Sequence, residues 1–313
     1  MPPSRRYLLV SPCRNEADYM VRTLESVAAQ TLRPALWVIV DDGSTDATPG
    51  ILADWAARHD WIRVVTKPDR GRRAVGPGVI EAFYFGLNQV GPDPESWQSF
   101  DYLCKLDLDL DLPPGYFAGL IARMEAEPRL GSASGKPWFT GPGGARIPEK
   151  IGDEMSVGMT KFYRTACFQA IGGFVQEVMW DGIDCHKSRQ LGWTARSFPD
   201  EALQFEHLRP MGSSQTGILT GRKRHGFGQY YMGSDFAFFT ASCLSRLTHP
   251  PVVLGALASW WGYVEAALRR LPRHQDRALV SLIRRYQRRA LIVGKARATA
   301  EVEAAHAHLW RAP

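Results

Sequence analysis

Short, mainly apolar runs alternate with amphipathic segments over the first third of the chain. The apolar runs, which predict buried strands, are residues 7–10, 36–40, 62–65 and 102–112. A helical spacing of apolar residues predicts helices over residues 18–30, 45–59 and 75–90. Apolar strands that alternate with helices are typical of a parallel sheet with helices on both faces. The chain is therefore predicted to be an α/β protein with a Rossmann-like, mostly parallel central sheet.

Polar clusters follow the predicted strands where each of them ends. These clusters are residues 12–16, 41–46, 67–73 and 107–111. The carboxyl ends of parallel strands meet at one edge of a sheet, where ligands of such folds bind. The sequence therefore predicts a ligand site built from these loops.

The run of alternating leucine and aspartate at residues 106–112 carries the most specific chemistry. On a continuous strand Asp107, Asp109 and Asp111 share one face and the leucines share the other. Carboxylates held close together repel one another, and a divalent metal bound through oxygen relieves that repulsion. The alternative is a solvated strand face.

Composition narrows the class of protein and its compartment. The 313 residues suffice for one large domain, or one domain with an appendage. The five cysteines are scattered without a CxxC spacing, which argues against a zinc site or disulfide framework and fits a reducing compartment. No apolar signal region precedes the first predicted strand, so we expect a cytoplasmic protein.

The order of motifs resembles family 2 glycosyltransferases of the GT-A type over roughly residues 7–210. The matching segments are SPCRNE at 11–16, VDDGSTD at 40–46, the Asp107-Leu108-Asp109 pair followed by Pro113-Pro114, IGGF at 171–174, DGID at 181–184 and LGW at 191–193. The resemblance implies an inverting transferase that moves one sugar from a nucleotide-diphosphate sugar, with UDP favoured. It further implies a Mn²⁺ or Mg²⁺ cofactor, because a metal can bridge the two phosphates and stabilise the departing nucleotide.

Candidate site residues follow from this resemblance and from residue chemistry. The resemblance assigns the metal to Asp107, Asp109 and His207. Arg73 and Arg222 are candidates for phosphate contact because guanidinium groups suit phosphate oxygens. The candidate nucleotide-sugar residues are together Pro12, Asn15, Glu16, Asp41, Asp42, Arg73, Asp107 and Arg222.

The predicted general base comes from the second half of the motif order. Inverting transfer needs a carboxylate that takes the proton of the acceptor hydroxyl. Trp180 occupies the position of the family's Glu, so Asp181 carries over as the base, with Asp184 as an alternative or a helper. The QxxRW motif of processive synthases does not follow Asp181, which favours a non-processive enzyme.

The last third of the chain differs from the rest in its pattern and charge. We expect a catalytic domain over residues 1–210, with halves at 1–112 and 113–210, and a helical appendage over residues 211–313. A basic, glycine-rich loop is expected at residues 220–231, opening a helix. The apolar stretch 247–264 keeps only about 13 suitable residues after its prolines, fewer than a membrane-spanning helix needs.

The basic segment 269–297 contains Asp276 as its sole acidic residue, in a chain of net charge +6. Together with Trp260 and Trp261 it indicates peripheral contact with an anionic membrane surface, at the inner face of the cell membrane. A packed core helix pair with solvated arginines is the alternative. Nucleic acid is not an expected partner, since no binding motif accompanies the charge.

The expected acceptor is a saccharide or a lipid-linked saccharide in the assembly of surface polysaccharide or glycolipid. Two rival hypotheses remain. One is transfer to a polyprenyl phosphate, which needs no base because the acceptor is already ionised. The other is a degenerate transferase that acts as a scaffold.

Overall fold

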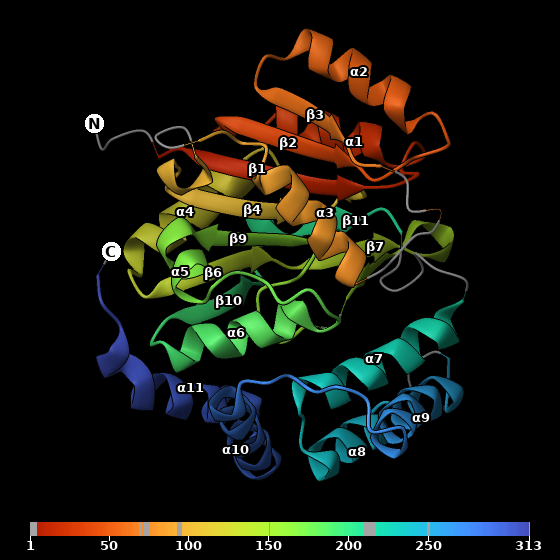
Figure 1. Ribbon diagram of the computed structural model, residues 1–313, viewed down its shortest axis with the longest axis vertical. Coiled ribbons are helices and arrows are strands. Elements are labelled where there is room, and N and C mark those ends of the chain that lie inside the picture. The colour runs from red at the N-terminus through yellow and green to blue at the C-terminus, as the bar shows by residue number, and fades with distance from the viewer. Residues whose placement is uncertain are drawn as a thin grey trace.

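A seven-stranded sheet forms the centre of the first two-thirds of the chain (Figure 1). The computed structural model describes residues 5–68, 71, 76–92, 96–149, 151–209, 217–248 and 251–312. The sheet strands are β1 (Tyr7–Cys13), β2 (Leu36–Asp41), β3 (Ile62–Thr66), β4 (Tyr102–Leu106), β6 (Leu130–Gly135), β9 (Thr160–Arg164) and β10 (Thr194–Phe198). Their order is β10-β6-β9-β4-β1-β2-β3. Only β9 among these strands runs antiparallel to its neighbours, so the predicted mostly parallel sheet is confirmed.

Helices cover both faces of this sheet. They are α1 (Met20–Ala28), α2 (Thr48–Arg58), α3 (Pro77–Leu87), α4 (Tyr116–Ala126), α5 (Thr165–Ala170) and α6 (Trp180–Gln190). Alternate residues of β1 enter two separate apolar clusters: Leu9 packs with Leu24 of α1, whereas Leu8 packs with Phe83 of α3. Successive side chains of a strand point to opposite faces, so both faces are buried and the strands are apolar throughout.

The prediction of one continuous strand over residues 102–112 is wrong, because the acidic run at 106–112 is divided between two sheets. Strand β4 ends at Leu106, and Leu110–Asp111 forms β5 in a second sheet. The Asp107 amide still donates to the Met159 carbonyl at 2.8 Å, which extends the pairing of β4 with β9. The backbone then leaves the central sheet, and the Asp109 carbonyl accepts from Leu208 at 2.8 Å. The turn still buries all four leucines in one cluster.

The second sheet has four strands in the order β5-β11-β7-β8. Its other members are β7 (Pro137–Thr140), β8 (Arg146–Pro148) and β11 (Phe205–His207). Because β11 pairs with β5, residues near 207 come to lie beside the end of the acidic run. Short 3₁₀ helices occur at Trp97–Ser99, Pro142–Gly144, Glu201–Leu203 and Ala307–Leu309.

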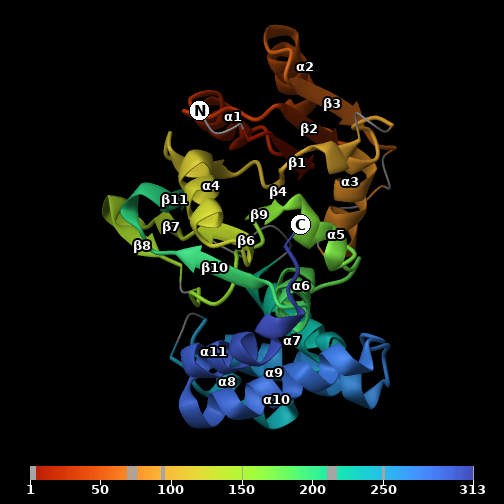
Figure 2. The same ribbon diagram turned by 90° about the vertical axis from the view of Figure 1, so that its left-hand side faces the viewer.

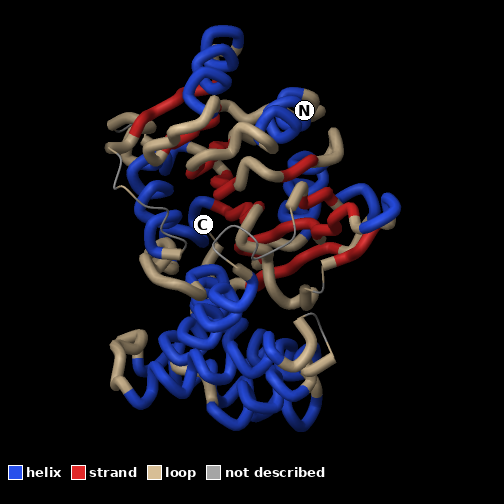
Figure 3. The backbone as a smooth tube through the Cα atoms, turned by 90° about the vertical axis from the view of Figure 1, so that its right-hand side faces the viewer, coloured by secondary structure: helices blue, strands red, loops and turns tan. Residues whose placement is uncertain are grey.

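Five helices form a separate layer next to α6 (Figures 1 and 2). They are α7 (Ile218–Met232), α8 (Phe236–Leu244), α9 (Leu254–Leu268), α10 (Arg277–Val293) and α11 (Lys295–His306). Figure 3 shows the strands confined to the other part of the molecule. The expected domain boundary at residue 210 lies outside the described residues. In the part of the chain that the structure describes, no helix combines the length and the apolar character needed to span a membrane.

The prediction of a basic loop at residues 220–231 is wrong, because these residues lie within α7. Glycine serves close helix packing here. A Cβ atom at Gly226 would meet the Ser259 carbonyl oxygen of α9 at 1.8 Å, and one at Gly262 would meet the Lys223 carbonyl oxygen at 2.1 Å. The glycines therefore let α7 and α9 approach backbone to backbone.

Candidate functional site

A cavity of about 610 Å³ opens at the carboxyl ends of β1 and β4, with α7 along one side. Most of the described residues that the sequence nominated line it. They are Pro12, Glu16, Asp42, Asp107, Asp109, Asp181, His207 and Arg222. Arg73, the remaining candidate from the loop after β3, lies outside the described residues.

Asn15 and Asp41 are not among the residues that line the cavity, and they connect the loops that border it. The Asn15 side-chain oxygen accepts from the Thr45 amide at 2.8 Å, and the Asn15 amide donates to the Ser44 hydroxyl at 2.9 Å. Asp41 accepts from the Ser44 amide at 2.9 Å. Asn15 also has a left-handed backbone, with φ of 53°. These contacts fix the loop after β2 against the loop after β1.

Asp42 lies at the end of β2 with its carboxylate near a cation. Lys67, just after β3, places its ammonium nitrogen 3.5 Å from Asp42 Oδ1. Arg14 donates to the Asp42 carbonyl oxygen at 2.6 Å. Asp42 is therefore held in place at the cavity wall, where it can accept a hydrogen bond from a ligand.

The chain's own cations contact both aspartates of the Asp107–Asp109 pair. Lys105 of β4 bonds to Asp107, and its ammonium lies 5.3 Å from the ring centre of Trp180. The Arg209 Nε donates to Asp109 Oδ2 at 2.5 Å, and the same guanidinium donates to Glu16 at 2.8 Å. Neither cation was predicted from the sequence.

His207 stands between two buried carboxylates. Its Nε2 lies 3.4 Å from Asp109 Oδ2, and its Nδ1 lies 3.2 Å from Glu149 Oε2. Burial lowers the pKa of His207, but the hydrogen bonds to Asp109 and Glu149 outweigh it and raise this pKa to about 9. For Asp109 burial acts to raise the pKa, but the contacts with His207 and Arg209 outweigh it and lower this pKa to about 2.

A divalent cation fits part of this arrangement. Asp109 Oδ1 is buried and has no hydrogen-bond partner among the described residues, although an isolated buried carboxylate oxygen is costly. Carboxylate oxygen and imidazole nitrogen are both suitable ligands for Mn²⁺. The described residues contain no group of three or more His, Cys, Asp or Glu side chains arranged for a metal. Asp109 and His207 could hold such an ion only if His207 lost its proton and other oxygens, such as those of a diphosphate, completed the coordination.

Asp181 lies in the first turn of α6 and lines the cavity. Its carboxylate packs over Gly158, where a Cβ atom would lie 2.8 Å from Asp181 Oδ2. The preceding Met179 has a left-handed backbone with φ of 64°, and so the chain turns sharply into the helix. The glycine and the turn together leave room for the Asp181 carboxylate at the cavity wall.

Asp184 lies one helical turn further on, inside the protein. Its carboxylate accepts from Lys161 at 2.6 Å, from the Tyr163 hydroxyl and from the Cys185 amide at 2.6 Å. The side chains of Lys161 and Asp184 are 0% and 1% exposed. This placement argues against Asp184 as a base and gives it a structural role.

Asp111 is separated from the other two aspartates. It forms an ion pair with Arg22 at 2.6 Å and does not line the cavity. Arg222, Arg224 and the half-buried His225 line the α7 side. Burial, then the nearby Arg246 and Arg222, lower the pKa of His225 to about 4, so this side chain is neutral at pH 7.

The fold and the cavity together define the class of protein. A mostly parallel sheet with an acidic pair after β4, and a helix-borne carboxylate in the same cavity, has the organisation of a GT-A glycosyltransferase. Residues 9–170 match glycosyl transferase family 2, and the chain belongs to that family.

The comparisons with individual proteins agree with this assignment. The poly-β-1,6-N-acetyl-D-glucosamine synthase of Staphylococcus aureus strain MSSA476 is 28% identical over 128 residues, which is 40% of this chain and 27% of the synthase. The chain thus matches about a quarter of the length of that relative. The synthase of Staphylococcus epidermidis is 27% identical over 126 residues, again 40% of this chain and 27% of the relative.

Two solved structures share the fold. The mannosyltransferase PcManGT from Pyrobaculum calidifontis, in complex with GDP-Man and Mn²⁺, has a TM-score of 0.55 at 18% identity, covering 98% of this chain and 88% of that one. Staphylococcus aureus TarS 1–349 with UDP has a TM-score of 0.52 at 15% identity, covering 98% and 93%. The protein is a family 2 glycosyltransferase, and both likenesses show the GT-A fold.

Proposed function

We propose that the protein transfers one sugar, with inversion, from a UDP-sugar to a saccharide or lipid-linked saccharide acceptor in surface polysaccharide or glycolipid assembly. The observation that carries this proposal is that Asp109 and Asp181 line the same cavity. A donor diphosphate and an acceptor hydroxyl can therefore meet in the same cavity.

The donor side of the mechanism follows from the β-strand ends. Asp42 accepts a hydrogen bond from the N–H of the base, and Asp107 accepts from the ribose hydroxyls or contributes to the metal site. Arg222 and Arg224 of α7 provide guanidinium groups for the phosphate oxygens. A divalent cation at Asp109 and His207, Mn²⁺ or Mg²⁺, would supply charge stabilisation for the departing diphosphate.

The acceptor side depends on Asp181. Its carboxylate takes the proton of the acceptor hydroxyl while that oxygen bonds to the anomeric carbon, from the face opposite the nucleotide. The bond between the anomeric carbon and the diphosphate oxygen breaks, and its electron pair leaves with the nucleoside diphosphate. One inversion and one proton transfer complete the reaction.

We also propose that the enzyme works at the inner face of the cell membrane as a peripheral protein. Of the 15 large apolar side chains that are exposed among the described residues, 13 lie between residues 218 and 292. Exposed apolar side chains that gather in one region mark an interaction surface. A lipid-linked acceptor would be held near the cavity by such a location.

The test compares Asp181→Asn with Asp54→Asn, a matched change at an exposed position of α2. A panel of nucleotide sugars, with and without Mn²⁺, first identifies the donor by its thermal stabilisation of the protein. Asp181→Asn should keep this stabilisation and lose about 10²- to 10⁴-fold in transfer rate, the range expected for a missing general base. Asp54→Asn should retain both.

Other outcomes would decide between the rival hypotheses. Near-normal transfer by Asp181→Asn would refute the base and favour an acceptor that is already ionised, such as a polyprenyl phosphate. If no nucleotide sugar stabilises the protein and transfer is absent, a scaffold function is favoured instead.

A further inference from the structure

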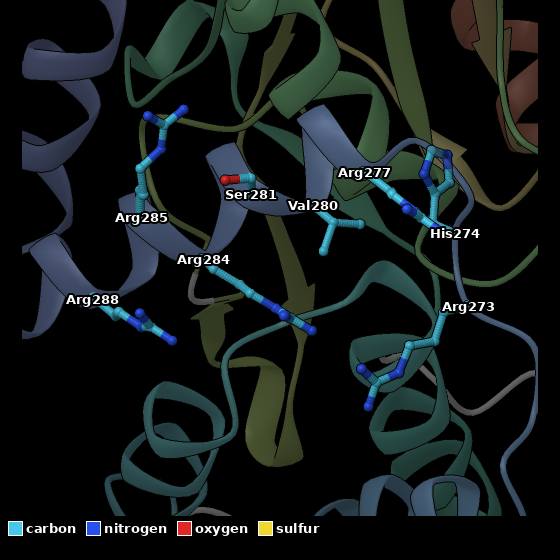
Figure 4. Close-up of a pocket in the computed structure, with 8 residues that line it drawn as sticks. All are labelled: Arg273, His274, Arg277, Val280, Ser281, Arg284, Arg285 and Arg288. Carbon is cyan, nitrogen blue, oxygen red and sulfur yellow. The ribbon is translucent and has the colours of Figure 1, made fainter.

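A groove of about 370 Å³ runs along α10, on the helical layer and distinct from the cavity described above (Figure 4). Its charged lining residues are Arg273, His274, Arg277, Arg284, Arg285 and Arg288. None of the described residues that line it is acidic. Figure 4 shows the side chains of Arg273 and Arg284 extending toward one another, one from the segment before α10 and one from α10 itself.

Little of this positive charge is neutralised within the protein. Arg288 pairs with Asp235 at 2.7 Å, and Arg284 donates to the Gly233 carbonyl oxygen at 2.8 Å. In the described parts of the chain, no carboxylate lies within ion-pair distance of Arg273, Arg277, Arg284 or Arg285. Like charges held together in a groove repel one another and attract anions. The groove therefore has the electrostatic character of an anion site.

The same face of α10 becomes apolar at its end. Residues 277, 281, 284, 285 and 288 follow the helical repeat, and Ile292 is one turn beyond Arg288. Leu291 and Ile292 are 48% and 78% exposed, although they are large apolar residues. The opposite face is buried against the protein through Leu282 and Ile283.

Exposed leucines also precede the groove along the chain. Leu268, at the end of α9, is 72% exposed, and Leu271 is 37% exposed. Arginines flanked by exposed aliphatic side chains are typical of segments that lie in a membrane interface, where the cations meet lipid phosphates and the apolar groups enter the acyl boundary. A small soluble phosphate would use the arginines and leave these aliphatic side chains in water.

We infer that the groove along α10 binds the phosphate of anionic phospholipids and that α10, with the leucines around it, docks the helical layer on the membrane surface. This site refines the membrane location included in the proposed function. The sugar-transfer chemistry is independent of it, because Arg273, His274 and the α10 arginines do not line the catalytic cavity.

The test measures co-sedimentation of the full chain with vesicles of phosphatidylcholine, alone or mixed with phosphatidylglycerol. The variant Arg277→Gln/Arg285→Gln removes two charges that make no hydrogen bond or ion pair within the described residues. The control Arg33→Gln/Arg58→Gln removes the same charge from the α1–β2 connection and from α2. The wild type should bind the phosphatidylglycerol vesicles but not pure phosphatidylcholine vesicles, and added salt should weaken this binding.

The groove variant should bind phosphatidylglycerol vesicles about 30-fold more weakly than wild type, from the usual contribution of two basic residues near an anionic surface. The control should bind like wild type, and Leu291→Ser/Ile292→Ser should also weaken binding. Equal binding by the groove variant and the control would overturn the inference. The inference would also be overturned if the wild type sedimented with neither kind of vesicle. The same holds if glycerol phosphate bound in the groove while the vesicles did not bind.

Two further measurements keep the outcomes distinct. Thermal melting of each variant shows whether it is folded, and nucleotide-sugar stabilisation of the same samples reports on the catalytic cavity. If the protein binds a nucleotide sugar but no vesicles, only the proposed membrane site is refuted. Vesicle binding without any donor binding refutes the proposed transferase reaction alone.

Discussion

Substitutions in the buried Lys161–Asp184 pair test whether Asp184 stabilises the fold or acts as the catalytic base. Asp184→Asn leaves the Lys161 ammonium uncompensated in a place where both side chains are shielded from water, at 0% and 1% exposure. Removing one partner of such a pair costs about 3–5 kcal/mol in the free energy of unfolding. Each kcal/mol corresponds to roughly 2 °C in a chain of more than about 250 residues, so the melting temperature should fall by about 6–10 °C.

The assay is a double-mutant cycle on thermal and urea unfolding, with Asp184→Asn, Lys161→Met and the double variant. The double variant should lose clearly less stability than the two single losses added together, since it leaves no unpaired buried charge. Below its melting temperature Asp184→Asn should retain transfer activity, in contrast to Asp181→Asn. A variant Asp184→Asn with wild-type melting and abolished transfer would refute this reasoning and assign the base to Asp184.

Three further changes test other parts of the argument. Arg209→Gln should raise the affinity for Mn²⁺ in the absence of nucleotide, measured by calorimetry, because it removes the cation that neutralises Asp109; unchanged affinity would contradict this. Burial, then Arg189 and Lys161, lower the pKa of His186 to about 3, below its ordinary value of about 6.5. As the pH drops, the unfolded chain therefore takes up this proton before the folded protein does. The free energy of unfolding should fall between about pH 6.5 and pH 3. His186→Gln should lose stability less steeply in that window, by up to about 1.4 kcal/mol per pH unit, when urea unfolding is followed against pH. Gly226→Ala should destabilise the protein by about 2 kcal/mol in urea unfolding because its Cβ would meet the Ser259 carbonyl oxygen at 1.8 Å, whereas the control Gly50→Ala on α2, with nothing within 4 Å, should be neutral or stabilising.

The first half of the fold was predictable because its signals are local. Continuous apolar strands and amphipathic helices alternate along the chain, and β1 to β3 lie where the pattern predicted them. The periodicity failed at residues 106–112, where two sheets compete for one apolar run. The pairing of Asp111 with Glu206 in the second sheet depends on a segment far away in the sequence, which no local pattern reveals.

The same limit applies to α7. Its glycines resemble a loop in the sequence, yet they lie in a helix because α9 packs directly on its backbone. Tertiary packing overrides the weak helix propensity of glycine at such positions. Motif order nominated Asp109 and Asp181, but Arg209 carries no motif and reaches Asp109 only because β11 pairs with β5.

The cations around the acidic pair change the physical argument for a metal. From the sequence, repulsion among three carboxylates on one strand called for a bound cation. In the folded protein Asp111 is paired elsewhere with Arg22, Lys105 contacts Asp107, and Arg209 contacts Asp109. The carboxylates are thus already compensated, so their mutual repulsion no longer argues for a metal. The remaining argument is the unpartnered Asp109 Oδ1 beside His207, two ligands that a metal would share with a diphosphate. Metal and nucleotide affinity should therefore be coupled, each ligand strengthening the binding of the other by the same factor.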